Sequence, residues 1–229
     1  MVPVMGRPML EWILEALAEA GFEKRDVVFV CGYAEDVVRA RYPEFTYVRN
    51  ADWENNNILH SLLCAREHLK DGFLSTYADI VYDGEIVKKL VASPQAITLG
   101  CDTAWRRRYV QRAQHPESDA EKMRATESVI TELSRNIQSE EAQGEFIGVM
   151  KLSAAGTEAF TSAFDAIAKS PPEGVWREGR TFKKAYLIDL LQHMLEQGST
   201  MHREDTAGAY MEIDTLEDLG HAKSWWESR

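Results

Sequence analysis

Apolar and polar positions alternate along most of the chain with the periods of helices and strands. Residues 8–22 carry apolar side chains at helical spacing, with Pro8 at the start and Gly21 at the exit, and this pattern predicts a helix. Residues 26–31 form a continuous apolar run, as expected of a buried strand. Further helical and strand patterns follow at 34–41, 45–48, 57–69, 73–80, 84–91 and 95–101. This alternation predicts an α/β fold with a doubly wound, mostly parallel sheet.

Residues 102–144 interrupt the alternation. They are polar and rich in arginine, and two short strands are predicted within them, at 121–126 and 128–133. The regular pattern then resumes with strands and helices at 145–152, 153–168, 181–197, 200–203, 209–213 and from 215. We therefore expect a single domain over residues 1–229 with a small β-rich insert at 102–144 on the substrate side. The apolar side of the helix at 182–195 fits either a homodimer contact or packing within the domain.

The composition narrows the function classes. The 229 residues carry a net charge of −11, which argues against nucleic-acid binding, because phosphate contacts need clustered lysine and arginine. No apolar run is long enough to span a membrane, and the chain start lacks the features of a signal peptide. The three cysteines show neither a zinc spacing nor a disulfide framework. We expect a cytoplasmic protein with no nucleic-acid or membrane partner, and a small phosphorylated substrate stays compatible with this charge.

Two aspartates occupy the ends of predicted strands. Asp79 follows Tyr77 near the end of the run at 73–80, and Asp214 precedes the helix that starts at Thr215. Open α/β sheets bind ligands at the carboxyl ends of their strands. Mg²⁺ prefers oxygen ligands and takes one or two carboxylates beside water and substrate oxygens. The pair is therefore a candidate metal site, and ordinary turn acids are the alternative.

A second group of residues offers contacts for a phosphorylated substrate. Asn57 and Ser61 lie one turn apart at a predicted helix start, which favours anions, although capping explains Asn57 nearly as well. Lys122 is a candidate cation for phosphate, with solvent exposure as the alternative. The densest basic and aromatic cluster could bind phosphate and an amine, or could be a solvated helix; its candidates are Trp105, Arg106, Arg108, Tyr109 and Arg112.

The order of several short motifs resembles that of a known superfamily. The start Val2-Pro3-Val4-Met5-Gly6-Arg7-Pro8-Met9-Leu10 is similar to the region after the nucleotide-binding loop of nucleotidyltransferases that make sugar-nucleotides and CDP-alcohols. Four more motifs follow in the expected order: Val30-Cys31-Gly32-Tyr33, Asn57 through Leu62, Tyr77-Ala78-Asp79 and Glu212-Ile213-Asp214. The branch it most resembles contains the choline-phosphate and phosphonate cytidylyltransferases, and the similarity covers nearly the whole chain.

This resemblance implies a Rossmann-like nucleotidyltransferase fold and a reaction. An oxygen of a small phosphorylated alcohol or phosphonate would attack the α-phosphorus of a nucleoside triphosphate, with CTP favoured, and release pyrophosphate. In such families Mg²⁺ is held by aspartates that match Asp79 and Asp214, and it neutralises charge in the transition state. Tyr77 would line the substrate site. The product would feed a surface-polysaccharide, phosphonate or lipid head-group pathway.

The resemblance also implies a feature that the printed sequence lacks. Family members begin with a short strand and a Gly-rich loop ending in Pro-Lys, which binds the triphosphate. Nothing of that kind precedes Met1, so we expect a chain that is truncated relative to the family, with bare strand edges and apolar surface. Either the start of the sequence is mis-assigned or trimmed, or the nucleotide loop has been lost. A real loss would suit a catalytically silent relative that acts as a binding or assembly protein. A separate alternative is a sugar-1-phosphate nucleotidyltransferase that uses UTP or dTTP.

Overall fold

A mixed sheet forms the centre of the molecule. The computed structural model describes residues 2–110 and 112–227, with side chains up to residue 224. Six strands pair in the order β5-β10-β7-β11-β9-β8, with bounds Gly72–Thr76, Gly144–Ser153, Ile97–Asp102, His202–Thr206, Val129–Leu133 and Lys122–Thr126. β7 and β11 run parallel, whereas β10 is antiparallel to β5 and β7, and β8 and β9 form an antiparallel hairpin. The predicted α/β class is confirmed, but the sheet is mixed rather than mostly parallel.

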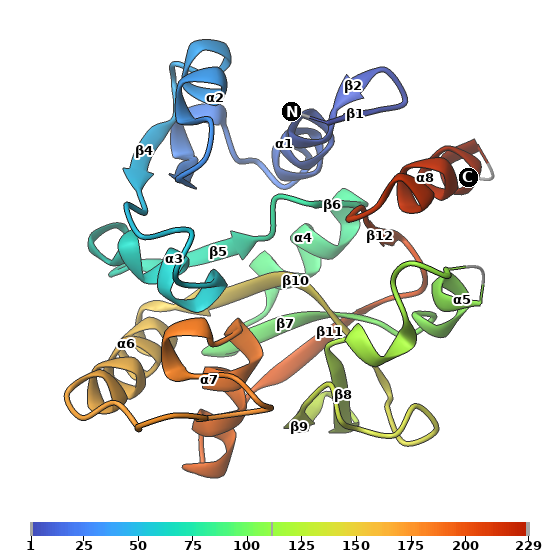
Figure 1. Ribbon diagram of the computed structural model, residues 1–229. Helices are drawn as coiled ribbons and strands as arrows, with labels where there is room; N and C mark the ends of the chain where they lie inside the picture. The colour runs from blue at the N-terminus through green and yellow to red at the C-terminus, as the bar shows by residue number, and fades with distance from the viewer. Residues whose placement is uncertain (1, 111, 228–229) are drawn as a thin grey trace.

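Smaller pairs of strands lie beside this sheet. β3 and β4 pair in parallel, β6 and β12 pair antiparallel, and β1 and β2 form a short ribbon; their bounds are Val28–Cys31, Thr46–Arg49, Ile80–Tyr82, Tyr210–Glu212, Pro3–Val4 and Arg7–Pro8. Figure 1 shows β4 and the nearby helix α2 (Glu35–Arg41) at one corner of the molecule, away from the hairpin β8–β9. The run at 73–80, predicted as one strand, is therefore divided between β5 and β6.

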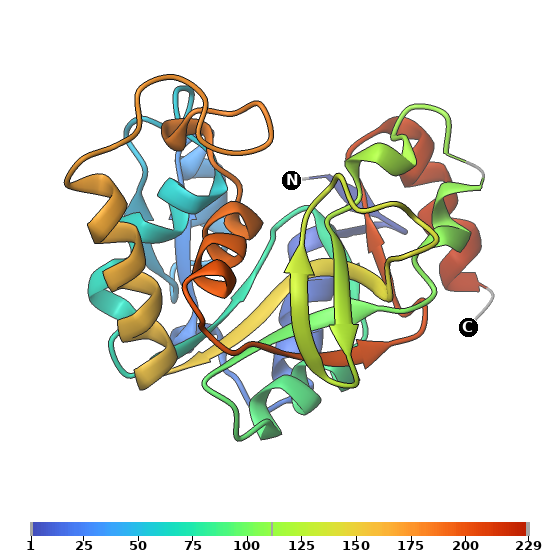
Figure 2. The same cartoon turned by 90° about the horizontal axis from the view of Figure 1, so that it is seen from below.

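Helices cover both faces of the sheet. α1 (Met9–Glu19) and α4 (Gly84–Ala92) pack on one face, where their apolar side chains meet Ile147 and Val149 of β10. The other face carries α3 (Ile58–Cys64), α6 (Ala154–Ala168) and α7 (Leu187–Glu196) (Figures 1 and 2). α5 (Arg106–Tyr109) and α8 (Leu216–Glu227) lie near the hairpin end of the sheet.

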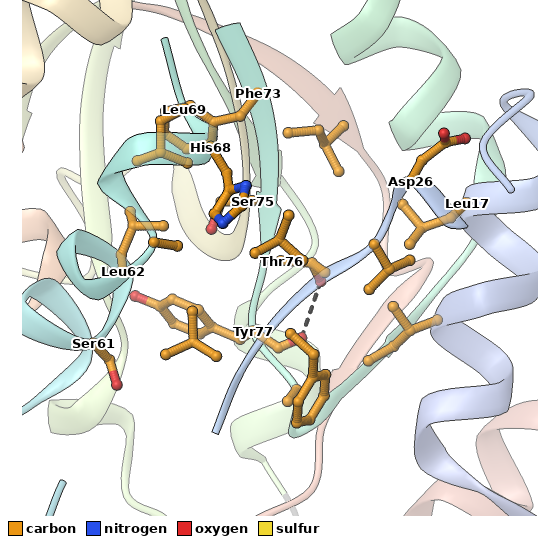
Figure 3. A pocket seen from close by; sticks show the side chains of 18 of the residues that line it. Leu17, Asp26, Ser61, Leu62, His68, Leu69, Phe73, Ser75, Thr76 and Tyr77 are labelled. Carbon is orange, nitrogen blue, oxygen red and sulfur yellow. Dashed lines mark hydrogen bonds between the residues drawn. The ribbon is translucent and has the colours of Figure 1, made fainter. Parts of the chain in front are cut away.

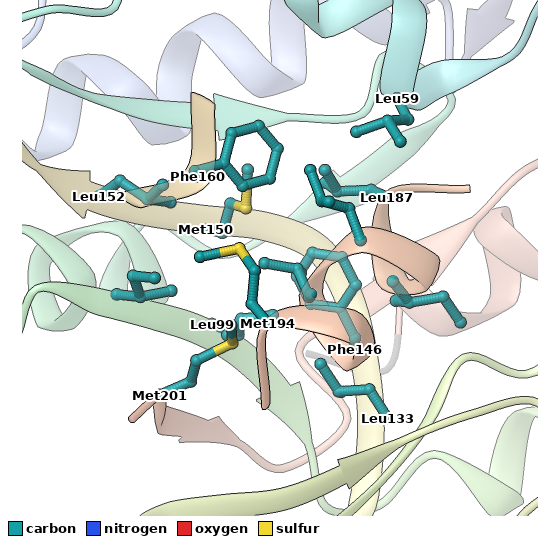
Figure 4. Close-up of a cluster of buried hydrophobic side chains, with 14 of the residues drawn as sticks. Leu59, Leu99, Leu133, Phe146, Met150, Leu152, Phe160, Leu187, Met194 and Met201 are labelled. Atoms are coloured by element: carbon teal, nitrogen blue, oxygen red, sulfur yellow. The ribbon is translucent and has the colours of Figure 1, made fainter. Parts of the chain in front are cut away.

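The larger core lies between the sheet and α3, α6 and α7. Figure 4 shows Phe160, Leu187 and Met194 over Met150 of β10 and Leu99 of β7. Each of these side chains is at most 2% exposed, so burial stabilises the fold by roughly 1.5–3 kcal/mol for each large apolar side chain. Packing within the chain therefore accounts for the apolar side of α7. Within the described residues, no helix has the length and apolar character needed to cross a bilayer.

An apolar cavity of about 380 Å³ separates β3 from β5 (Figure 3). Its walls are formed mainly by α1, α3 and the two strands, with Leu17, Leu62 and Phe73 among the lining residues. No strand pairing among the described residues joins β3 to β5. The lining of this cavity includes neither Asp79 nor Asp214, although it includes Ser61 and Tyr77.

Candidate active site

A polar cavity of about 470 Å³ is lined by side chains that lie far apart in the sequence, from Trp53 to Asp214. Its walls come from α3, the β5–β6 turn, the residues just before β8 and just after β9, β10, β12 and the start of α7. The lining includes Trp53, Asn56, Asn57, Ser61, Tyr77, Asp79, Asp119, Glu121, Arg135, Glu145, Tyr186, Tyr210, Glu212 and Asp214. Both predicted metal-binding aspartates are therefore in one cavity.

Backbone pairing brings the two aspartates together. Glu212 of β12 pairs with Ile80 of β6, and the N–H of Ile213 donates to the carbonyl of Asp79 at 2.8 Å. Because the pair is antiparallel, Asp79, just before β6, and Asp214, just after β12, lie at the same end of it. Asp79 is exposed at the cavity surface, yet surrounding protein and, next, the charge of Asp214 raise its pKa. Two carboxylates that repel each other in this way form a favourable site for a cation.

The position of Asp79 depends on a bulge in β10. The register of β10 against β7 shifts between Phe146 and Met150, and Gly148 lies there with φ +74°. The N–H of Tyr77 donates to the Gly148 carbonyl at 3.0 Å, and the Tyr77 ring lies against the glycine. A Cβ at position 148 would be 2.4 Å from Cδ2 of Tyr77, so only glycine fits without movement. This glycine therefore fixes the strand that delivers Asp79.

His115 and Glu212 extend the acidic pair, and neither was predicted from the sequence. His115 Nδ1 lies 3.3 Å from Asp214 Oδ2, and His115 Nε2 lies 3.4 Å from Glu212 Oε2. One ligand atom from each residue can be chosen so that all three lie within 4.8 Å of one another. Burial, and next the charge of Asp214, raises the pKa of Glu212 to about 9. The motif Glu212-Ile213-Asp214 contained the signal for Glu212, because alternate strand residues share a face.

Arg112 supports this cluster and does not line the cavity. Its Nε donates to Asp218 Oδ1 at 2.6 Å, and its Nη2 lies 3.0 Å from His115 Nδ1. Asp218 in turn accepts from the backbone N–H groups of Asp214 and Thr215. The partners of Arg112 are therefore protein groups next to His115 and Asp214, and its predicted contact with the acceptor stays a prediction.

The other members of the basic and aromatic cluster also lie outside the cavity lining. Trp105 and Tyr109 are 2% and 7% exposed and point into a small core, since residues four apart share one side of a helix. Arg108 bridges Asp102 and Glu145, and Arg106 pairs with Glu140 at 3.4 Å. The structure therefore places Arg108 in a buried ion pair, Trp105 and Tyr109 in a small core and Arg106 at the surface, and the acceptor contacts predicted for these four residues stay a prediction.

Lys122 is buried, which rules out the alternative of a solvent-exposed side chain, but the cavity lining does not include it, and its predicted contact with phosphate stays a prediction. Its Nζ donates to the backbone carbonyl of Arg135 at 2.6 Å, and burial lowers its pKa. Its neighbour Glu121 does face the cavity and accepts from the Tyr77 hydroxyl at 3.3 Å. Burial is the main cause that raises the pKa of Glu121 to about 7, and Arg135 opposes it. The cation of the cavity is Arg135, which the sequence did not reveal.

Asn57 and Ser61 line the cavity but also have structural partners. Asn57 Oδ1 accepts from the N–H of Ile58 at 2.8 Å and caps α3. Ser61 Oγ accepts from Asn50 Nδ2 at 2.9 Å, and Asn50 exchanges two hydrogen bonds with Asn56. The network holds these polar side chains at one wall of the cavity, so their substrate contacts stay a prediction.

Comparison with known sequences identifies relatives with nucleotidyltransferase names. The profile of the MobA-like NTP transferase domain matches residues 1–143. The CTP:phosphoglutamine cytidylyltransferase of Campylobacter jejuni is 25% identical over 96% of this chain and 88% of its own length. The CMP-5'-(3-aminopropyl)phosphonate synthase of Streptomyces rubellomurinus is 33% identical, over 42% of this chain and 16% of its own length. The resemblance predicted from the motif order is confirmed.

Solved structures of similar fold also carry nucleotidyltransferase names. The inositol-1-phosphate CTP transferase of T. maritima has a TM-score of 0.69 at 16% identity, covering 97% of this chain and 83% of its own. The CTP:phosphocholine cytidylyltransferase of Streptococcus pneumoniae has a TM-score of 0.68 at 18% identity, covering 100% and 88%. An apo UDP-glucose pyrophosphorylase has a TM-score of 0.71 at 15% identity, covering 100% and 90%. These matches confirm the predicted nucleotidyltransferase fold.

Proposed function

Because the chain belongs to the family of MobA-like NTP transferase domains, we propose that it transfers CMP from CTP to a small phosphorylated alcohol or phosphonate and releases pyrophosphate. The observation that carries the proposal is the Asp79–Asp214 pair inside the polar cavity. The relative that aligns over 96% of the chain is named for CTP and a phosphorylated small molecule, and this supports the choice of nucleotide and acceptor.

We propose Mg²⁺ as the metal and Asp79 and Asp214 as its protein ligands. The donor set fits, because both side chains are carboxylates that lie in one cavity, and burial and then the charge of Asp214 raise the pKa of Asp79. Few protein ligands and a polar cavity leave coordination positions for water and phosphate oxygens. When bound, the metal would supply charge neutralisation for the phosphates. His115 would hold Asp214 in place through the contact at 3.3 Å.

The remaining side chains of the cavity would bind and orient the two substrates. Asn57 and Ser61, on the α3 wall, offer hydrogen-bonding groups beside Trp53. Tyr77 and Tyr186 supply rings that can exclude water from the reacting groups. Catalysis of this kind rests mainly on positioning and charge neutralisation, and no protein nucleophile is required. The chain would therefore act through a preformed site.

The test measures pyrophosphate release by the full chain. CTP, UTP and dTTP are each offered with phosphocholine, phosphoethanolamine, 2-aminoethylphosphonate, O-phosphorylated glutamine and glucose-1-phosphate. We expect CTP with a small phosphorylated acceptor to be fastest, EDTA to abolish the rate and Mg²⁺ to restore it. Faster turnover of UTP or dTTP with glucose-1-phosphate would instead favour the sugar nucleotidyltransferase, whose fold is represented by UDP-glucose pyrophosphorylase.

Variants test the two aspartates directly. Asp79→Ala and Asp214→Ala should each reduce the rate at least a hundredfold, because one variant leaves a single carboxylate for the metal. Asp71→Ala is the matched control, since this exposed aspartate lies ahead of β5, and the cavity lining does not include it. Full activity in either cavity variant would reject the mechanism. No release with any pair of substrates would favour the silent relative.

A further inference from the structure

The polar cavity contains a single cationic side chain among many acids. Its lining includes six carboxylic acids, and Arg135 is the one lysine or arginine among the described lining residues. Two of the acids are the proposed metal ligands. The remaining carboxylates repel a phosphorylated acceptor that enters the cavity. An anion that leaves water needs an oppositely charged partner there. A guanidinium at this place is therefore a candidate contact for the acceptor.

The backbone of Arg135 is held from two sides. Its N–H donates to Glu178 Oε1 at 3.0 Å, and its carbonyl accepts from the buried Lys122 Nζ at 2.6 Å. The hydroxyl of Ser134 also donates to Glu178 Oε1, at 2.5 Å. A buried lysine and a glutamate thus fix the turn that follows β9. This support orients the side chain before any ligand arrives, as recognition sites require.

The guanidinium of Arg135 is held in one orientation, but its N–H donors are not all used in hydrogen bonds. It lies over the ring of Tyr186, with Cζ 4.2 Å from the ring centroid. Its ion pair with Glu121 is long, with Nη2 and Oε1 3.8 Å apart, which exceeds hydrogen-bond distance. Its Nε is buried without a hydrogen-bond partner, and no hydrogen bond joins the guanidinium to a described residue. Guanidinium donors that no protein group accepts are available to an anion such as a tetrahedral phosphoryl group, two of whose oxygens can accept from one guanidinium.

Arg124, on the same hairpin, shows the contrast. Its guanidinium donates to Glu132 and Glu141, and the cavity lining does not include it. Arg124 is thus paired within the hairpin, whereas Arg135 keeps donors for a ligand.

We propose that Arg135 binds the phosphoryl or phosphonyl group of the acceptor, with the Tyr186 ring as its support and Glu121 as the counter-ion that it leaves on binding. This inference rests on the proposed nucleotidyltransfer. In this assignment the anionic end of the acceptor binds at the turn after β9. The metal held by Asp79 and Asp214 binds the phosphates of the nucleotide.

The experiment compares Arg135→Gln and Arg135→Lys with the control Arg124→Gln. Pyrophosphate release is measured while either the acceptor or CTP is varied, using the best acceptor of the panel. We expect Arg135→Gln to raise the KM of the acceptor roughly ten- to hundredfold, Arg135→Lys to lie between, and the KM of CTP to change less than threefold. A rise in the KM of CTP with that of the acceptor unchanged would overturn the assignment.

Direct binding separates this inference from the proposed function. Inorganic phosphate is titrated into each full-length variant without nucleotide and followed by ³¹P NMR. Wild type and Arg124→Gln should bind it alike, and Arg135→Gln at least tenfold more weakly. Glu121→Gln, which keeps an acceptor for the Tyr77 hydroxyl, should bind it more tightly because a competing charge is removed. No binding to wild type, or equal binding to Arg135→Gln, refutes the anion site even if the enzyme is active. Arginine-dependent binding without turnover supports the site and refutes the reaction.

Discussion

Replacement of Gly148 by alanine should separate backbone strain from a steric clash in the strand pair that delivers Asp79. Gly148 has φ +74°, and an added Cβ would be 2.4 Å from Cδ2 of the Tyr77 ring. The backbone conformation costs alanine about 1 kcal/mol, and displacement of the packed ring adds roughly 1–3 kcal/mol. The sum is about 2–4 kcal/mol of unfolding free energy. For a chain of this length it lowers Tm by about 5–15 °C.

Gly174 provides the matched control. Its φ is +75°, and no atom lies within 4 Å of an added Cβ, so Gly174→Ala carries the backbone cost alone. Any effect of alanine on the unfolded chain is common to both variants and cancels in their difference. Thermal unfolding followed by circular dichroism should therefore show Gly148→Ala several degrees below Gly174→Ala. Pyrophosphate release should fall only in Gly148→Ala, because Tyr77 leads directly into Asp79. Equal Tm values for the two variants would refute the reasoning.

Three further predictions concern buried groups. The pKa of Glu121 is raised to about 7 from 4.5, so its ionisation destabilises the folded state as pH rises through this interval. The free energy of unfolding of Glu121→Gln should therefore gain up to about 3 kcal/mol relative to wild type between pH 5 and pH 8. Urea denaturation that gives the two proteins parallel curves of unfolding free energy against pH would contradict this. Arg108→Gln leaves two buried carboxylates without their partner and should cost about 3–5 kcal/mol in urea denaturation, whereas the exposed Arg107→Gln should stay within about 0.5 kcal/mol. The exposed Cys64 should react with a thiol reagent before the buried Cys101, whose pKa burial raises to about 12, and mass spectrometry of the native protein would reveal the reverse order.

The periodicity of the chain predicted most elements because burial of one face imposes it locally. It failed where pairing depends on distant residues. The run at 73–80 was predicted as one strand, but the chain turns after Thr76, and β6 then pairs with β12 rather than continuing in the main sheet. The direction of β10 was equally hidden, because the insert before it returns the chain antiparallel to β7. Neither partner is encoded in the pattern of the strand itself.

The candidate site divides in the same way. Asp79 and Asp214 could be predicted because a carboxylate at a strand end is a local signal. The sequence of the cluster around Arg108 was ambiguous, because arginines beside aromatic rings are typical of a ligand site and of a buried ion pair alike. Its partners Asp102 and Glu145 lie 6 and 37 residues away, and only the fold brings both to one guanidinium. Arg135 was missed for the opposite reason, because a lone arginine after a short strand has no distinctive neighbours.

The electrostatics of the cavity connect these residues into one arrangement. Hydrogen bonds from protein groups already stabilise the negative charge of two of its acids. Arg108 and Tyr109 donate to Glu145, and Tyr77 donates to Glu121. For Asp79, burial and then the charge of Asp214 raise the pKa, and His115 only partly offsets them, so a bound cation would stabilise its charged form. Arg135 lines the same cavity with unsaturated donors. Under the two proposals, one region of the cavity would attract a metal with its nucleotide, and another would attract the anion of the acceptor. Two negatively charged substrates can share it only with their charges neutralised at separate positions.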